Sequence, residues 1–284
     1  MASAPGGALG AAARGLRGRA AGRARGGSRG AARAAGAGPG AGPGAGAGAL
    51  VGALPAEGRE RVGLYVARLL EANRRMNLTG ARSEAEALER HAGDSLALLP
   101  VLEGARPAAA AQAPARVLDV GSGAGLPGMV LAIARPEWEL TLLDSLQKRC
   151  RFLEEAAREL GLRNVDVRWG RAEDLAREPG LRDGFDLVTA RAVAEMATLV
   201  ELCLPFARPG AGALVAAKGP GPGDEVARAA AAIEALGGAA PKVVPVDSFS
   251  GDGQRFTAVV VQKASPTPNK YPRRAGLPNK RPLA

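Results

Sequence analysis

The residues best suited to chemistry lie in one short stretch, where an apolar segment runs into a glycine-rich turn and then into a helix. Residues 117–128 have the sequence VLDVGSGAGLPG. Glycines at such a turn let the backbone bend sharply and approach a ligand closely. The helix that follows presents free N–H groups to an anionic group. A glycine-rich loop alone is shared with nicotinamide and flavin enzymes, so this pattern predicts a nucleotide-type cofactor without choosing between them.

Two acidic residues near this loop favour one cofactor. Asp144 closes the next apolar run, 19 residues past Gly125, where a carboxylate can accept hydrogen bonds from ribose hydroxyls. Asp119 precedes the first glycine of the loop and gives an acidic-x-Gly-x-Gly pattern. The chain also has a single glycine-rich crossover, with no second half for a nicotinamide substrate. These features favour S-adenosylmethionine over a nicotinamide.

A third element of the predicted cofactor site is the loop GRAED, residues 170–174. In a nucleoside site this loop could lie along the edge of the adenine ring. The acidic residues fit the first turn of a short helix equally well, so the loop alone leaves both interpretations open.

The elements that must position these residues follow an alternating pattern, which predicts a parallel sheet covered on both faces. The predicted strands are Arg116–Val120, Leu140–Leu143, Val165–Trp169, Phe185–Thr189 and Ala213–Ala217, with helices over 127–134, 146–160, 194–203 and 224–236. Two late strand candidates, Lys242–Val246 and Phe256–Gln262, predict a closing hairpin. The expected fold is α/β and Rossmann-like, with seven strands of which one is antiparallel.

A helical region is predicted before the sheet. Residues 59–76 have amphipathic spacing, and a second helix is expected from Ser83 to about Leu99. Ser83 with Glu86 forms a capping-box pattern. His91, the single histidine of the chain, lies on one face of that helix with Asp94 and Ser95.

Composition divides the chain into a neutral body and two basic ends. Residues 1–56 carry seven Arg and no acid before Glu57, and residues 263–284 carry six basic residues and no acid. Removing these charges from the net charge of +10 leaves about −3 for residues 57–262. The predicted organisation is an extension over 1–56, a helical region over 57–110, an α/β domain over 111–262 and a basic tail over 263–284.

The N-terminal extension is too rich in Ala and Gly to bury an apolar core. Its acid-free, Arg-containing composition is typical of a transit peptide, which predicts a plastid, with a mitochondrion or the cytoplasm as alternatives. A disordered tail without function, or an arm that binds nucleic acid, also fits this composition. The two cysteines predict no disulfide framework. No metal site, no membrane span and a monomer are expected.

Together, these motifs resemble the RsmG (GidB) family, the bacterial and plastid 16S rRNA guanine-N7 methyltransferases. The resemblance covers residues 60–283 and rests on the stretches MNLT (76–79), HxxDS (91–95), DVGSGAGLPG (119–128), LLDSLQKR (142–149), GRAED (170–174), TARA (189–192), AAKG (216–219) and a tail containing KYPRR (270–274). It implies an S-adenosylmethionine-dependent methyltransferase fold that acts on small-subunit ribosomal RNA or on the small ribosomal subunit particle.

The resemblance also implies roles for individual residues. The implied cofactor contacts are Gly121, Leu126, Asp144, Ala172, Glu173 and Arg191, with Gly123 of the same loop expected beside them, and the implied RNA contacts are Lys148, Arg149 and Lys218. The basic residues of the tail, Lys270, Arg273, Arg274 and Lys280, are expected to contact RNA phosphates because the body of the protein is nearly neutral. Arg191 is the candidate for positioning the base.

No residue is predicted to act as a general base, because guanine N7 carries a lone pair and no proton. His91 is therefore expected to order the helical region or to meet RNA. Two other functions remain open on the sequence. One is a methyltransferase for another substrate, since the fold does not fix the substrate. The other is an RNA-binding assembly factor with a vestigial cofactor site.

Overall fold

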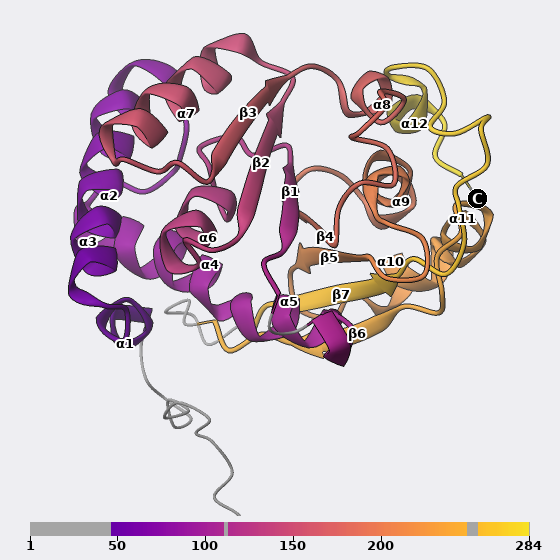
Figure 1. Ribbon diagram of the computed structural model, residues 1–284, viewed down its shortest axis with the longest axis horizontal. Coiled ribbons are helices and arrows are strands. Elements are labelled where there is room, and N and C mark those ends of the chain that lie inside the picture. The colour runs from indigo at the N-terminus through magenta and orange to yellow at the C-terminus, as the bar shows by residue number, and fades with distance from the viewer. Residues whose placement is uncertain (1–46, 111–112, 249–254, 284) are drawn as a thin grey trace, which may run out of the picture. The chain divides into compact units, whose positions relative to one another are not determined.

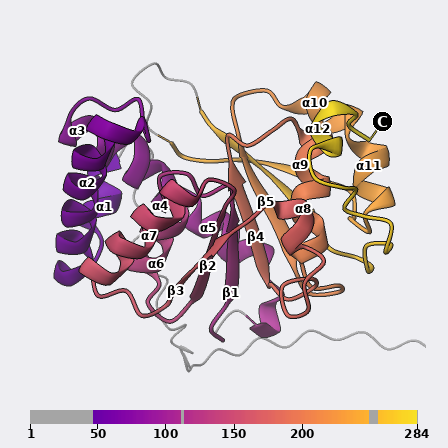
Figure 2. The same ribbon diagram turned by 90° about the horizontal axis from the view of Figure 1, so that it is seen from above.

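A seven-stranded sheet separates two layers of helices in the computed structural model, which describes residues 47–110, 113–248 and 255–283 (Figures 1 and 2). The strands are β1 Arg116–Val120, β2 Glu139–Asp144, β3 Val165–Trp169, β4 Leu187–Arg191, β5 Ala213–Lys218, β6 Lys242–Pro245 and β7 Thr257–Gln262, in the order β3-β2-β1-β4-β5-β7-β6. Strands β1 to β5 pair in parallel, and β7 is antiparallel to both of its neighbours. The predicted fold class and the closing hairpin are confirmed.

The central strands are buried on both faces, as a parallel sheet between helix layers requires. Successive residues of β1 alternate between the two sides: Val117 packs into one apolar cluster and Leu118 into the other. In the paired register, Asp119 lies opposite Leu142 of β2 and Thr189 of β4. The carboxyl ends of β1, β2 and β4 therefore meet at one edge of the sheet.

The first helix layer combines the N-terminal region with two crossover helices (Figure 2). It contains α1 Ala47–Gly52, α2 Ala56–Met76, α3 Glu84–Ala87, α4 Asp94–Ala97, α5 Leu99–Ala105, α6 Gly128–Ala134 and α7 Gln147–Glu159. The second layer contains α8 Ala172–Leu175, α9 Met196–Cys203, α10 Gly223–Arg228, α11 Ala230–Ala235 and α12 Leu277–Lys280. Across the described ranges, no helix has the length and apolar character needed to cross a bilayer.

The N-terminal boundary differs from the prediction. The extension was predicted to reach residue 56, but α1 is helical and Leu54 is buried. Leu50 and Val51 also pack against the core. These three apolar side chains anchor the segment, whereas the preceding Ala/Gly-rich sequence has few side chains of that size. Residues 1–46, on which the rest of the transit-peptide prediction falls, lie outside the described residues.

The predicted helix from Ser83 to about Leu99 forms, with an internal π segment that separates α3 from α4. The capping box forms at its start, where Glu86 N–H donates to Ser83 Oγ at 3.2 Å. The next residues, Leu88–Gly93, form a π-helix before α4 begins. A π turn inside a helix is often found at functional sites, and this one contains His91.

Two further boundaries shift. Strand β4 begins at Leu187 and ends at Arg191, two residues later than predicted, because Phe185 forms only an isolated bridge with Ala207. Arg191 is thus the last residue of the strand. The predicted helix over residues 224–236 is divided at Ala229 into α10 and α11.

The C-terminal segment is folded onto the second layer and is not a free tail. Lys263 is 1% exposed, and its ammonium donates to the carbonyls of Leu204 and Leu236 at 2.9 Å each. Burial lowers the pKa of Lys263 to about 8. Further along, Thr198 Oγ1 of α9 donates to the carbonyl of Pro278 at 3.2 Å.

Candidate functional site

The glycine-rich loop joins β1 to α6 and turns back through three glycines in the left-handed region. Gly121, Gly123 and Gly125 have φ values of 71°, 59° and 91°, which side chains rarely allow. A Cβ on Gly125 would lie 2.5 Å from Met129 Cγ, and one on Gly121 would lie 2.8 Å from Val193 Cγ2. A Cβ on Gly123 would meet nothing closer than Gly121 O at 3.7 Å. The loop therefore has open space at its centre and close contacts at its flanks.

Two buried side chains, Asp119 and Tyr65, hold this loop by hydrogen bonds to its backbone. Asp119 Oδ2 accepts from Gly128 N–H at 3.0 Å, and Tyr65 of α2 donates its hydroxyl to the carbonyl of Ala124 at 2.5 Å. Asp119 Oδ1 is buried without a hydrogen-bond partner among the described residues. Burial raises the pKa of Asp119 to about 6 and raises that of Tyr65 well above its usual range. Tyr65 was not among the predicted site residues, although it lies beside Val62 and Val66 on the buried face of α2.

Asp144 links the end of β2 to the loop. Its Oδ2 accepts from Gly123 N–H at 2.9 Å and its Oδ1 accepts from Leu146 N–H at 2.8 Å. Arg149 Nη1 lies 3.4 Å from Asp144 Oδ2. The structure thus brings Gly121, Gly123 and Asp144 together as predicted for a cofactor site. It places Arg149, predicted to contact RNA, beside the same carboxylate.

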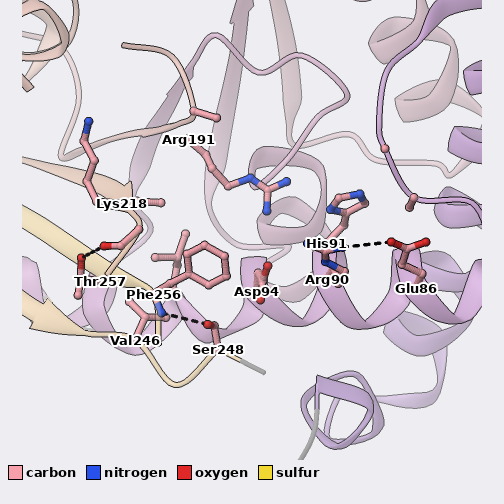
Figure 3. Close-up of a pocket in the computed structure, with 16 residues that line it drawn as sticks. Glu86, Arg90, His91, Asp94, Arg191, Lys218, Val246, Ser248, Phe256 and Thr257 are labelled. Carbon is pink, nitrogen blue, oxygen red and sulfur yellow. Dashed lines mark hydrogen bonds and ion pairs between the residues drawn. The ribbon is translucent and has the colours of Figure 1, made fainter. Parts of the chain in front are cut away.

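A cavity of about 520 Å³ lies between the carboxyl ends of β4 and β5, the N-terminal helical region, and residues that follow β6 and precede β7 (Figure 3). Its polar lining comes from Glu86, Arg90, His91 and Asp94 on one side and from Arg191 and Lys218 on the other. The volume falls within the range of about 300–1,000 Å³ typical of small-molecule pockets, which is enough for a flipped nucleobase.

Arg191 connects the cavity with the cofactor loop. Its guanidinium points into the cavity above Asp94 (Figure 3). Burial lowers the pKa of Arg191, and the negative charges of Asp94 and Asp119 oppose that shift. Burial also raises the pKa of Asp94 to about 6. No hydrogen bond or ion pair joins these two side chains within the described part of the chain, so both are free to meet a ligand.

His91 fastens two N-terminal segments to each other. Its Nε2 is hydrogen-bonded to Thr79 Oγ1, and Thr79 N–H donates to Asn73 Oδ1 at 2.9 Å. Its Nδ1 is buried without a partner in the part of the chain that the structure describes. Burial lowers the pKa of His91, so the ring is neutral near pH 7. This geometry agrees with the predicted ordering role.

Lys218 lines the cavity but its charge is already paired. Its Nζ lies 2.6 Å from Glu225 Oε1 and donates to the carbonyl of Ala194 at 2.8 Å. Glu225 Oε1 also accepts from Met196 N–H at 2.6 Å. Lys218 and Glu225 therefore fix the loop between Arg191 and α9, which gives Lys218 a role that the sequence did not predict.

The remaining predicted residues divide between the cofactor side and the C-terminal segment. Leu126 and Ala172 are buried beside the loop and at the start of α8. Glu173 is also buried, and its Oε1 accepts from Gly276 N–H at 2.7 Å. It therefore holds the C-terminal segment with at least one of its oxygens.

The four predicted RNA contacts of the C-terminal segment are not equivalent. Arg273 forms a two-pronged pair with Glu201, with Nε 2.9 Å from Oε1 and Nη2 2.6 Å from Oε2. Glu201 is 0% exposed. Lys270, Arg274 and Lys280 are exposed, as is Lys148 at the start of α7. The side chains that can reach a phosphate without breaking an internal pair are thus these four, whereas Arg273 has a structural partner.

The site fits S-adenosylmethionine. The open centre of the loop at Gly123 leaves room for backbone contact with a ligand, and the unpartnered Asp119 Oδ1 offers an acceptor beneath it. Asp144, at the end of β2, stands where a ribose-binding carboxylate is expected. Sheet order, loop and carboxylate together define a Rossmann-like methyltransferase domain.

Comparison with known proteins gives the family. The family model GidB, described as rRNA small subunit methyltransferase G, matches residues 59–249. Ribosomal RNA small subunit methyltransferase G of Symbiobacterium thermophilum is 47% identical over 231 residues, which cover 80% of this chain and 90% of that protein. The protein of the same name from Moorella thermoacetica is 46% identical over 219 residues, covering 77% and 88%. The chain belongs to the GidB family, so the resemblance seen in the sequence is confirmed.

Among solved structures, the O-methyltransferase TomG from Streptomyces achromogenes in complex with SAM is similar to this chain. It has a TM-score of 0.46 and 18% identity, over 70% of this chain and 90% of that one. The chain is therefore a methyltransferase of this family, and the predicted cofactor, S-adenosylmethionine, is confirmed.

Proposed function

We propose that this protein transfers a methyl group from S-adenosylmethionine to N7 of a guanine in small-subunit ribosomal RNA. The observation that carries the proposal is the cavity, which holds an uncommitted arginine that interacts electrostatically with Asp119 at the end of β1. The family name supports small-subunit rRNA as the substrate. The guanine and its N7 atom are supported by the chemistry of the cavity.

When bound, S-adenosylmethionine supplies a methyl group on a positively charged sulfur. The glycine-rich loop and Asp144 would hold the cofactor at the ends of β1 and β2. Val193, in the loop that follows Arg191, lies close to Gly121. Catalysis then comes from holding the base in line with the methyl group and excluding water. The target guanine must leave its RNA stack to enter the cavity.

Arg191 is the group that can position guanine. Arginine usually reads guanine by donating to both O6 and N7, but that geometry would occupy the lone pair that has to attack. Arg191 therefore donates to O6 alone and leaves N7 free. No proton has to be removed from N7, so the reaction needs no general base. The only histidine, His91, is hydrogen-bonded to Thr79.

The wider setting of the reaction follows from the exposed charges and the ends of the chain. Lys148, Lys270, Arg274 and Lys280 contact RNA phosphates in this proposal, and the substrate is the RNA or the small ribosomal subunit particle. The protein acts as a monomer. The acid-free residues 1–46 direct it to the plastid stroma, with the mitochondrion or cytoplasm as alternatives.

Single-turnover methylation of small-subunit rRNA by three variants tests this arrangement. Arg191→Ala is expected to slow methyl transfer about 10²–10³-fold, the usual effect of removing one positioned donor. Arg191→Lys should restore little, because a point charge cannot reproduce the planar guanidinium. His91→Ala should retain chemistry once RNA and cofactor are bound. Full activity of Arg191→Ala, or loss of chemistry in His91→Ala with both ligands bound, would contradict the proposal.

A further inference from the structure

The cavity contains a second uncommitted group opposite Arg191. Asp94 lies at the start of α4, directly after the π-helix, and its side chain faces the guanidinium across the cavity (Figure 3). Its Oδ1 is buried without a hydrogen-bond partner among the described residues. A buried, unsatisfied carboxylate oxygen is costly to the folded state, so this position is better explained by a ligand than by stability.

A second carboxylate in the same cavity provides a comparison. Glu86 Oε2 accepts from Arg82 N–H at 2.9 Å, and Glu86 Oε1 lies 3.2 Å from Arg90 Nη1. Both of its oxygens are therefore used in capping the helix and in a surface ion pair. Of the two cavity-lining carboxylates in the described ranges, only Asp94 keeps its oxygens for a ligand.

The chemistry of guanine matches this pair of groups. Next to the N7 edge, guanine presents O6 as an acceptor and then N1–H and N2–H₂ as donors. An arginine suits O6, and a carboxylate suits the two donors, since each of its oxygens can accept one hydrogen bond. Adenine would instead present a lone pair at N1 to the carboxylate and an amino group to the arginine. The two charged groups would thus select guanine and reject adenine.

We propose that Asp94 is the specificity-determining residue of this enzyme, which accepts hydrogen bonds from N1–H and N2–H₂ of the target guanine while Arg191 donates to O6. This inference rests on the proposed function. Because the contacts lie on O6 and the Watson–Crick edge, N7 stays free on the other side of the base. The π-helix contributes by directing Asp94 into the cavity, and the bond between His91 and Thr79 keeps that segment in place.

The test compares guanosine with inosine, which lacks only the N2 amino group, at the target position of the small-subunit RNA. In the wild type, inosine should lower kcat/KM about 10- to 100-fold, the effect of losing one hydrogen bond to a charged acceptor. In Asp94→Asn, guanosine should react more slowly, and the inosine penalty should nearly disappear. The matched control is Glu89→Gln, which neutralises an exposed carboxylate of the π-helix that does not line the cavity. It should keep the full inosine penalty.

The outcomes separate this inference from the proposed function. Absence of 7-methylguanosine from the guanosine substrate of the wild type would refute the proposed reaction. Methylation at N7 with the same inosine penalty in wild type and Asp94→Asn would refute the role of Asp94 alone. Lack of any inosine penalty in the wild type would do the same, without depending on the folding of a variant. Cofactor binding by Asp94→Asn, measured by calorimetry, should remain, whereas a purely structural role would weaken it.

Discussion

The pair between Arg273 and Glu201 leads to a prediction that separates stability from RNA binding. Glu201 is fully buried on α9, and three of the hydrogen bonds that it accepts come from the Arg273 guanidinium, at 2.6 to 3.1 Å. Arg273→Met would keep a long side chain but leave the carboxylate without its cation. The sequence pattern alone predicted a phosphate contact for this residue.

The expected loss of stability follows from the burial of Glu201, whose charge would be left without a partner. Removing one partner of a buried ion pair costs about 3–5 kcal/mol. The Arg273 side chain is 21% exposed, so the lower end applies, about 3 kcal/mol. For a domain of this size, that loss lowers the melting temperature by about 6–12 °C. Arg273→Met combined with Glu201→Leu should recover much of it, because the buried charge is then gone.

Two assays on the same proteins decide the question. Thermal unfolding measures the stability loss, and the salt dependence of RNA binding measures phosphate contacts. Lys270→Met and Arg274→Met, both at exposed positions, should change stability by less than about 0.5 kcal/mol and should each reduce the salt slope by about 0.7–0.9. Arg273→Met should leave the slope unchanged. An unaltered melting temperature with a reduced slope would refute the structural assignment and restore Arg273 as an RNA contact.

Three other predictions follow from the cofactor loop and the chain ends. Two variants should each weaken S-adenosylmethionine binding at least about tenfold in calorimetry, with the fold retained: Gly121→Val and Asp144→Ala. In the first, the new side chain would clash with Val193 at a position of positive φ. Wild-type affinity in both variants would exclude this cofactor site. Deleting residues 1–46 should preserve methylation in vitro and abolish uptake by isolated plastids, and normal uptake of the truncated chain would rule out a transit peptide. Burial raises the pKa of Asp119 from 3.8 to about 6. The folded state therefore binds a proton at Asp119 more tightly than the unfolded state does. The stability that this proton contributes is lost as the pH rises through 6. In urea titrations, the stability of Asp119→Asn relative to wild type should therefore increase by about 2 kcal/mol between about pH 4.5 and pH 7.5, whereas a difference that does not vary with pH would contradict the buried charge.

The fold was predictable because its information is local. Each central strand is a short apolar run between turn residues, and the glycine-rich loop is visible as a pattern of neighbouring residues. The capping box at Ser83 is local as well. The π-helix that follows was not predictable, since its hydrogen bonds differ from those of an α-helix by one residue and leave the apolar spacing almost unchanged.

The features missed in the site depend on residues far apart in the sequence. Tyr65 reaches Ala124 across 59 residues, and Arg273 reaches Glu201 across 72. Nothing in the composition of the C-terminal segment distinguishes Arg273, which is paired, from its exposed neighbour Arg274. Lys218 is a different case, because its partner Glu225 lies only seven residues along the chain, in α10, and no regular spacing marks the pair in the sequence. Charge alone therefore does not distinguish basic residues held in an internal ion pair from exposed ones.

The atom that receives the methyl group is the central claim, and replacing that atom tests it most directly. Small-subunit ribosomal RNA is transcribed with guanosine or with 7-deazaguanosine, which has carbon in place of N7. Each RNA is incubated with the enzyme and labelled S-adenosylmethionine, and the nucleosides are then identified by mass spectrometry. We predict labelled 7-methylguanosine from the first RNA and no labelled nucleoside from the second. Label at another atom of the first RNA, or methylation of the 7-deazaguanosine RNA, would contradict N7 as the acceptor.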